Sequence, residues 1–248
     1  MIDKSWHYPS LIAHRGAGKL APENTLAAFK LGYAHGYRMF ECDVKLSADG
    51  VAYLLHDATL ERTSSGFGDA GTHSWASLSQ LDAGRWHSAQ YAGEPIPTLA
   101  NIASFVRANG CYLNIEIKPI PGTDAQTGAA VATLAAQLWA GAATPPLLSS
   151  FSPTALAAAR DAQPQLPRAL LVDTLPADWQ AQLIDLGCVA LVVNCKHFSD
   201  ELVFKVKAAG YRLLTYTCNE PPHAACLLAL GVDGVITDAV DLIHTVNS

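Results

Sequence analysis

Charged residues are scarce in this chain of 248 residues: Asp, Glu, Lys and Arg together make up 15% of it, and the formal net charge is −6. The few Lys and Arg residues are scattered and form no basic stripe, which argues against a nucleic-acid partner. The N-terminus MIDKSWHYPS lacks the apolar stretch of a signal peptide, and no window reaches the roughly eighteen apolar residues of a membrane span. Because half of the residues are hydrophobic, the composition predicts a soluble globular protein with a large core.

Several motifs that would announce a cofactor or a metal are also absent. The sequence contains no P-loop, no H-E-x-x-H or H-x-H pattern and no C-x-x-C pair. Most of its six cysteines lie in or beside strand-like runs, which favours buried free thiols in a reducing cytoplasm. These cysteines are Cys42, Cys111, Cys188, Cys195, Cys218 and Cys226.

Short apolar runs rich in β-branched residues alternate with Ala- and Leu-rich stretches along the chain. We expect strands at 11–16, 39–44, 112–118, 147–151, 169–172, 190–194, 213–217 and 234–237. We expect helices at 25–35, 99–109, 125–140, 153–163, 177–186, 200–209, 222–230 and 241–246, several of them ended by a glycine. Strands that are apolar on both faces and each followed by a helix predict a single α/β domain over 1–248, a (β/α)8 TIM-type barrel. A doubly wound open sheet is the structural alternative.

Residues 45–98 interrupt this rhythm. The segment KLSADGVAYLLHD reads as a hairpin that turns at ADG, and residues 58–98 show neither a helix nor a strand period. We therefore predict a hairpin and a loop-rich cap inserted after the second strand. An insertion of this length is usually functional.

Ionisable residues gather where the first three barrel strands end. His14 and Arg15 lie near the end of the first strand, Glu41 and Asp43 near the end of the second, and Glu116 and Lys118 at the end of the third. Strand alternation puts Glu41 and Asp43 on one face, and the carboxyl ends of barrel strands form the active-site rim. If the hairpin turns at ADG, Asp43 pairs with Leu55, and His56 returns to the carboxylates.

Three converging carboxylates need a neutralising partner, which a proton, Lys118 or a metal ion could provide. A hard divalent cation, Mg²⁺ or Ca²⁺, suits oxygen ligands best. Arg15 and Lys118 add positive charge for an anion such as a phosphate, and two histidines can act as general acid and base. The remaining histidines are interpreted as surface or loop residues: His7, His35, His73, His87, His197, His223 and His244.

Taken as a set, the motifs resemble the glycerophosphodiester phosphodiesterase family, within the phospholipase-C-like phosphodiesterase barrels. The matching segments run in order along almost the whole chain: AHRGAG (13–18), PENTLAAF (22–29), FECDVKLSADG (40–50), LLHDATLERTSSGFG (54–68), IPTLANI (96–102), LNIEIKP (113–119), SSFSP (149–153), TYTCN (215–219) and GVDGVITD (231–238). The resemblance implies a TIM-type barrel with an insertion after the second strand. The short length and the lack of a signal peptide resemble the cytoplasmic branch.

The resemblance also implies roles for individual residues. Glu41, Asp43 and Glu116 would bind one divalent metal ion, Mg²⁺ or Ca²⁺. His14 and His56 would form the acid/base pair, and Arg15 and Lys118 would hold the phosphate. Tyr216 stands where family members commonly have Trp, so an aromatic wall of the alcohol pocket is retained with an added hydroxyl.

The resulting hypothesis is a lipid- and glycerol-metabolism enzyme that hydrolyses small glycerophosphodiesters to glycerol 3-phosphate and an alcohol. The nucleophile is either water or the glycerol 2-hydroxyl, which would give a cyclic phosphate first; a substrate analogue lacking that hydroxyl would distinguish them. Rival hypotheses are a phospholipase D or lyase acting on intact lipids, a Schiff-base aldolase using Lys118, and a phosphodiester-binding barrel without activity. No feature demands an oligomer, and none predicts membrane insertion.

Overall fold

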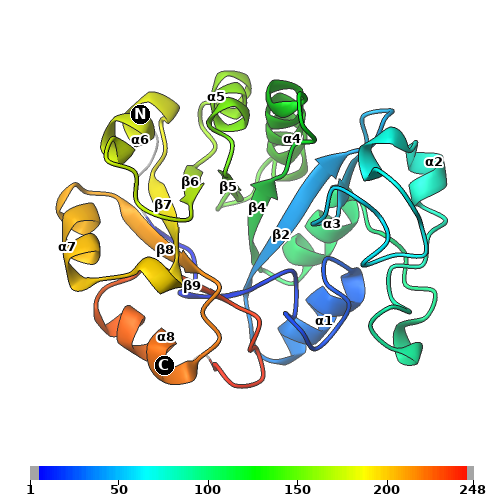
Figure 1. The fold of residues 1–248 in the computed structure, drawn as a ribbon, viewed down its shortest axis with the longest axis horizontal. Coiled ribbons are helices and arrows are strands. Elements are labelled where there is room, and N and C mark those ends of the chain that lie inside the picture. Colours follow the sequence, from blue (N-terminus) through cyan, green and yellow to red (C-terminus); the bar gives the residue numbers. More distant parts are fainter. Residues whose placement is uncertain (1–5, 245–248) are drawn as a thin grey trace.

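In the computed structural model, which describes residues 6–244, eight parallel strands form a barrel (Figure 1). The barrel is closed because β1 pairs with both β2 and β9. The (β/α)8 prediction is therefore confirmed, and the open sheet is excluded. The barrel strands are β1 (Leu11–Ala13), β2 (Met39–Leu46), β4 (Tyr112–Ile117), β5 (Leu147–Ser150), β6 (Arg168–Val172), β7 (Ala190–Asn194), β8 (Arg212–Tyr216) and β9 (Gly234–Thr237).

Helices surround the barrel and follow the predicted ranges to within a few residues. They are α1 (Leu26–Ala34), α3 (Leu99–Ala108), α4 (Asp124–Leu138), α5 (Pro153–Ala162), α6 (Trp179–Leu186), α7 (Asp200–Ala208) and α8 (Pro221–Ala229). Side-chain caps begin several of them: the hydroxyls of Thr98, Ser152 and Ser199 each accept a backbone N–H of the first turn. The helix predicted at 241–246 is wrong in its described part, because 239–243 form only a single turn whose Ile243 carbonyl accepts the hydroxyl of Tyr37.

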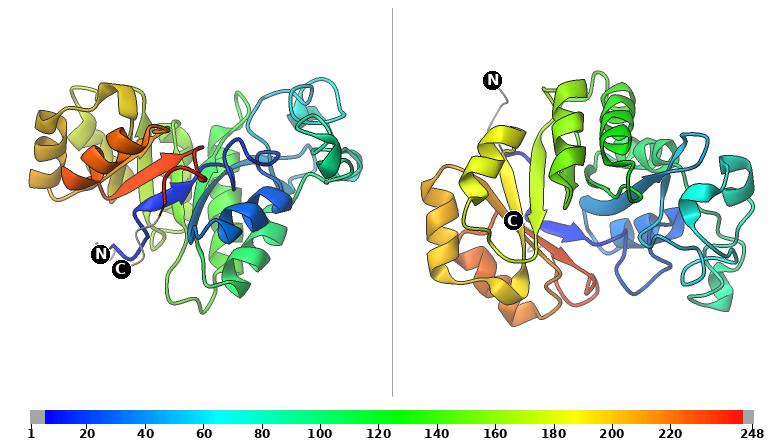
Figure 2. Two further views of the ribbon diagram at one scale, coloured as in Figure 1. Left: turned by 90° about the horizontal axis from the view of Figure 1, so that it is seen from below. Right: turned by 45° about the horizontal axis from the view of Figure 1, so that its top comes forward.

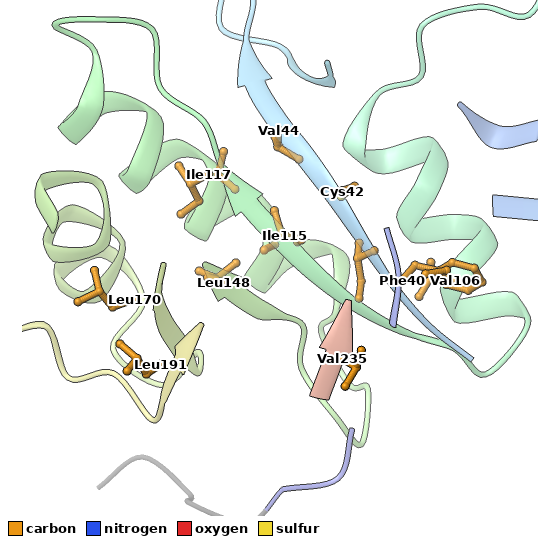
Figure 3. Close-up of a cluster of buried hydrophobic side chains, with 14 of the residues drawn as sticks. Phe40, Cys42, Val44, Val106, Ile115, Ile117, Leu148, Leu170, Leu191 and Val235 are labelled. Atoms are coloured by element: carbon orange, nitrogen blue, oxygen red, sulfur yellow. The ribbon is translucent and has the colours of Figure 1, made fainter. Parts of the chain in front are cut away.

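The strands bury apolar side chains on both faces, and the outer face packs under the helices. Phe40, Cys42 and Val44 of β2 point into this outer layer with Ile115 and Ile117 of β4 (Figure 3). Met39 of β2 belongs to a separate cluster inside the barrel, together with Ile12, Leu214 and Ile236. The odd-numbered residues of β2 and the even-numbered residues of β4 therefore face inward, as strand alternation requires.

The insertion after β2 lies to one side of the barrel, beside α1 and α3 (Figure 2). Its first part is the predicted hairpin: β3 (Ala52–Leu54) pairs antiparallel with β2, and the Leu55 N–H donates to the Asp43 carbonyl. The rest holds only short helices, η1 (Ala70–Thr72), α2 (Trp75–Leu78) and η2 (Ala89–Tyr91), over a small core of its own. Among the described residues, no helix is both long and apolar enough to cross a membrane.

A buried guanidinium stabilises the end of the barrel at which the parallel strands begin. Arg168, at the start of β6, is 1% exposed. It donates to the carbonyls of Leu166, Leu186 and Gly187, at 2.7, 3.1 and 2.9 Å. One side chain thus satisfies the carbonyls that end α6 and those of the loop before β6, which have no helical partners of their own.

Replacing Arg168 by Met should lower the free energy of unfolding by at least about 3 kcal/mol, because several buried carbonyls lose their donor. The thermal midpoint should fall by roughly 6 °C or more, measured by circular dichroism. Arg85→Met is the matched control, since the Arg85 side chain is 79% exposed; its midpoint should stay close to wild type. Equal midpoints for the two variants would contradict the role given to Arg168.

Candidate active site

Three carboxylates converge inside the barrel mouth. Glu41 and Asp43 come from the inner face of β2, and Glu116 comes from the inner face of β4, where it is the register partner of Asp43. One oxygen of each lies within 4.8 Å of the others. Side-chain exposures of 3% for Glu41, 1% for Asp43 and 12% for Glu116 show that water screens this group of charges poorly.

Asp43 is the carboxylate with partners on every side. Its oxygens lie 3.3 Å from Arg15 Nε and 3.5 Å from Lys118 Nζ, and Asn24 Nδ2 donates to Oδ2 at 2.8 Å. Burial alone would raise its pKa, but the positive charges of Arg15, Lys118 and His56 lower the pKa of Asp43 to about 2. Asp43 is therefore ionised throughout the physiological range.

The ionised forms of Glu41 and Glu116 are stabilised less well than that of Asp43. Burial, together with repulsion from the other carboxylates, raises the pKa of Glu41 well above its ordinary value. Burial and repulsion from Asp43 raise the pKa of Glu116 to about 7, although Lys118 Nζ lies 3.2 Å from its Oε1. The Glu41 Oε1 atom is buried and has no hydrogen-bond partner among the described residues. The two cations in ion-pair contact with the group, Arg15 and Lys118, therefore compensate its three negative charges only in part.

The loop between β1 and α1 places Arg15 over these carboxylates by adopting left-handed backbone angles. Arg15 has a φ of 51°, which is uncommon for a residue with a side chain, and its backbone N–H donates to Glu41 Oε2 at 3.1 Å. Gly18 follows at a φ of 57°, and a Cβ there would lie 2.1 Å from the Asp238 carbonyl oxygen. Such a close approach requires glycine.

His14 is oriented from the far end of the chain. Its Nδ1 lies 2.6 Å from Asp238 Oδ1, and its Nε2 lies 3.8 Å from Glu41 Oε2. Asn219 holds Asp238 in turn, donating from Nδ2 to Oδ2 at 3.0 Å. Hydrogen bonds from His14 and Asn219 lower the pKa of Asp238 even though burial opposes them. An ionised Asp238 accepts from Nδ1–H and leaves Nε2 free to face the carboxylates.

His56 has the same kind of support from the insertion. Its Nδ1 lies 2.7 Å from Asp57 Oδ1, and Arg62 Nε donates to the other oxygen of that carboxylate, Oδ2. Arg62 also pairs with Glu23, whose Oε1 accepts from Arg15 Nη1 at 2.8 Å. Burial lowers the pKa of His56, although the Asp43 charge opposes the shift. This chain of ion pairs links His56 back to Arg15.

A cavity of about 310 Å³ opens beside the carboxylates and is lined in part by Lys45, Glu116, Lys118 and Phe151. Phe151 packs edge-on against Tyr216, with ring centroids 5.7 Å apart, and the Tyr216 hydroxyl donates to the Val172 carbonyl. Lys45 is only 4% exposed, and among residues 6–244 it forms no ion pair. Burial, reinforced by repulsion from Lys118, lowers its pKa.

All the residues singled out from the sequence thus lie at one end of the barrel. Arg15, Glu41, Asp43, Glu116 and Lys118 are in direct contact, His14 adjoins Glu41, and His56 is within electrostatic reach of Asp43. Tyr216 stands further out, against Phe151. Sequence reasoning missed the supporting residues Glu23, Asn24, Lys45, Asp57, Arg62, Asn219 and Asp238. Lys45 carried a readable signal, because it shares the strand face of Glu41 and Asp43.

Comparison with known proteins identifies the family of this chain. The model of the glycerophosphoryl diester phosphodiesterase family matches residues 14–242. The chain belongs to that family. It is therefore a hydrolase with glycerophosphodiester phosphodiesterase activity, and the resemblance seen in the sequence is confirmed.

Relatives cover the chain almost end to end. A glycerophosphodiester phosphodiesterase of Caldanaerobacter subterraneus is 32% identical, over 92% of this chain and 93% of its own length. A phosphodiesterase structure from Oleispira antarctica, solved with its product sn-glycerol-3-phosphate, is 37% identical with a TM-score of 0.88 and covers 94% of both chains. A glycerophosphodiester phosphodiesterase structure from Agrobacterium tumefaciens is 27% identical, has a TM-score of 0.80 and covers 94% of this chain and 98% of its own.

The raised pKa of Glu116 predicts a pH-dependent penalty in metal-free protein. Between its ordinary pKa of 4.5 and its folded pKa of about 7, the folded state binds more protons at Glu116 than the unfolded state does, so stability falls as pH rises. Glu116→Gln removes this contribution. Its stability relative to wild type should therefore increase by on the order of 2 kcal/mol from pH 5 to pH 8, measured by urea unfolding in EDTA. A constant difference across this range would contradict the prediction.

Proposed function

We propose that the chain hydrolyses glycerophosphodiesters to glycerol 3-phosphate and an alcohol, using one divalent cation and two histidines. The observation that carries the proposal is the convergence of Glu41, Asp43 and Glu116 on one point, between the cations Arg15 and Lys118 and beside His14. A phosphodiester is an anion with several oxygens, which is the kind of group that such a mixed site accommodates.

The three carboxylates fit a hard cation by their chemistry. They offer only oxygen ligands, Glu41 Oε1 is buried without a partner among the described residues, and burial together with mutual repulsion raises two of the three pKa values. Glu41, Asp43 and Glu116 would hold Mg²⁺ or Ca²⁺, both of which prefer such ligands. When bound, the cation would polarise a phosphoryl oxygen as a Lewis acid.

The other side chains would bind the substrate and move its protons. Arg15 and Lys118 would hold the phosphoryl oxygens, because each already points its charge at the carboxylate group. Tyr216, packed on Phe151, would form one wall of the pocket for the alcohol. His14 and His56 would transfer protons through Nε2, because a carboxylate occupies Nδ1 in each ring.

A metal requirement is tested on glycerophosphocholine, with release of glycerol 3-phosphate as the readout. EDTA should abolish turnover, and excess Mg²⁺ or Ca²⁺ should restore it in wild type but not in Glu41→Gln. Glu201→Gln, an exposed change on α7, should behave like wild type. Turnover that is indifferent to chelation would overturn the metal site, and absence of turnover with either ion would overturn the proposed substrate.

Substituting the histidines separates their roles. His14→Ala and His56→Ala should each lower kcat on glycerophosphocholine by at least about 10²-fold, whereas His73→Ala in the insertion should not. A glycerophosphate ester of 4-nitrophenol releases an anion that needs no proton, so it should restore most of the activity of the variant that lacks the general acid. If either variant keeps wild-type kcat on both substrates, that histidine is not part of the mechanism.

We also propose a cytoplasmic location, on the basis of cysteine use. Four of the six cysteines are buried as free thiols, and Cys195 and Cys218 come close together without being joined. Thiols of this kind are typical of proteins that work in a reducing compartment.

A further inference from the structure

A second group of potential metal ligands lies at the same end of the barrel, outside the carboxylate site. Cys195 comes directly after β7, Cys218 lies two residues after β8, and His223 is in the first turn of α8. Their ligand atoms, two sulfurs and an imidazole nitrogen, all lie within 4.8 Å of one another. None of the three belongs to the machinery described above.

The fold brings these residues together by strand register. β7 and β8 are parallel neighbours in which Asn194 is level with Tyr216, so Cys195 comes beside Thr217. The Cys195 thiol donates to the Thr217 carbonyl at 3.1 Å, and the Cys218 N–H donates to the Ile236 carbonyl at 3.0 Å. Two prolines, Pro221 and Pro222, begin α8 and restrict the backbone that carries His223.

The three ligands differ in how far they are exposed to solvent. Cys218 is 1% exposed and forms the floor of the cluster, Cys195 is half-buried, and His223 is exposed. An ion could therefore enter from the solvent past the imidazole and bind against a buried sulfur. The solvent side leaves room for water as a further ligand.

We propose that Cys195, Cys218 and His223 form a site for a thiophilic divalent cation such as Zn²⁺. Two thiolates and one imidazole are ligands that this class of ion prefers, whereas Mg²⁺ and Ca²⁺ prefer oxygen. Tetrahedral zinc with bonds of about 2.0–2.3 Å needs ligand atoms roughly 3.3–3.8 Å apart, so small side-chain movements complete the site. Binding exchanges two thiol protons for one cation and releases them to the solvent.

An ion bound at this site would also affect the contacts that orient His14. Between Cys218 and His223 lies Asn219, which holds Asp238, and Asp238 orients His14. A cation joining Cys195 to both ends of this loop would restrain it. The site itself does not depend on the proposed reaction, since its ligands take no part in that chemistry.

The test uses Co²⁺ as a spectroscopic probe on the whole chain, reduced with a phosphine and kept in excess Mg²⁺. Wild type should bind one Co²⁺ with a thiolate charge-transfer band and the intense visible absorption of tetrahedral cobalt, and Zn²⁺ should displace it. Cys195→Ser and His223→Ala should each weaken binding at least about 10-fold. Both residues reach the surface, so neither change leaves a cavity in the core.

Cys226→Ser is the matched control, because Cys226 is an exposed cysteine on α8 outside the cluster. It should bind Co²⁺ like wild type, and circular dichroism should show that all variants are folded. The proposal is overturned if wild type shows no charge-transfer band at saturating Co²⁺. It is equally overturned if folded Cys195→Ser binds Co²⁺ with the affinity and band intensity of wild type, or if the band disappears in Cys226→Ser.

Discussion

The site depends on one electrostatic constraint: three carboxylates are held within 4.8 Å of one another where water hardly reaches them. Two like charges 4 Å apart repel by about 4 kcal/mol at an effective dielectric constant of 20. Arg15 and Lys118 offset the charge of Asp43, whose pKa stays low, but the pKa values of Glu41 and Glu116 remain raised. The strands cannot relieve this repulsion, because β2 and β4 are packed on both faces and cannot turn their inner residues away.

Around the carboxylates runs a second set of contacts drawn from distant parts of the chain. Asp238, just after β9, orients His14, and Asp57 in the insertion orients His56. Arg62 and Glu23 connect the insertion to Arg15. Closure of the barrel makes this network possible, since it brings the end of β9 next to β1. The insertion then supplies what the eight strands lack, a second supported imidazole.

The parts of this architecture that follow local rules could be predicted from the sequence. Alternation placed Glu41, Asp43 and Glu116 on the inner face, and the ADG turn set the register that pairs Asp43 with Leu55. The supporting residues could not be predicted in this way. Asn24 reaches Asp43 only because its backbone is left-handed, and Asp238 meets His14 across 224 positions of sequence. Neither contact follows from a local sequence pattern. The short segment after β9 fails in the opposite way: its sequence pattern predicts a helix, but the segment forms only a single turn.

Lys45 shows how stability and function are balanced in the mouth. A buried ammonium without an ion-pair partner among residues 6–244 opposes folding, and its lowered pKa reflects that cost. A count of charges explains why Lys45 is buried here. The three carboxylates of the mouth are matched by three cations, Arg15, Lys45 and Lys118. A divalent cation added to this balanced set leaves an excess of positive charge directed into the cavity that Lys45 lines. A phosphodiester carries one negative charge, so a bound substrate would offset half of that excess.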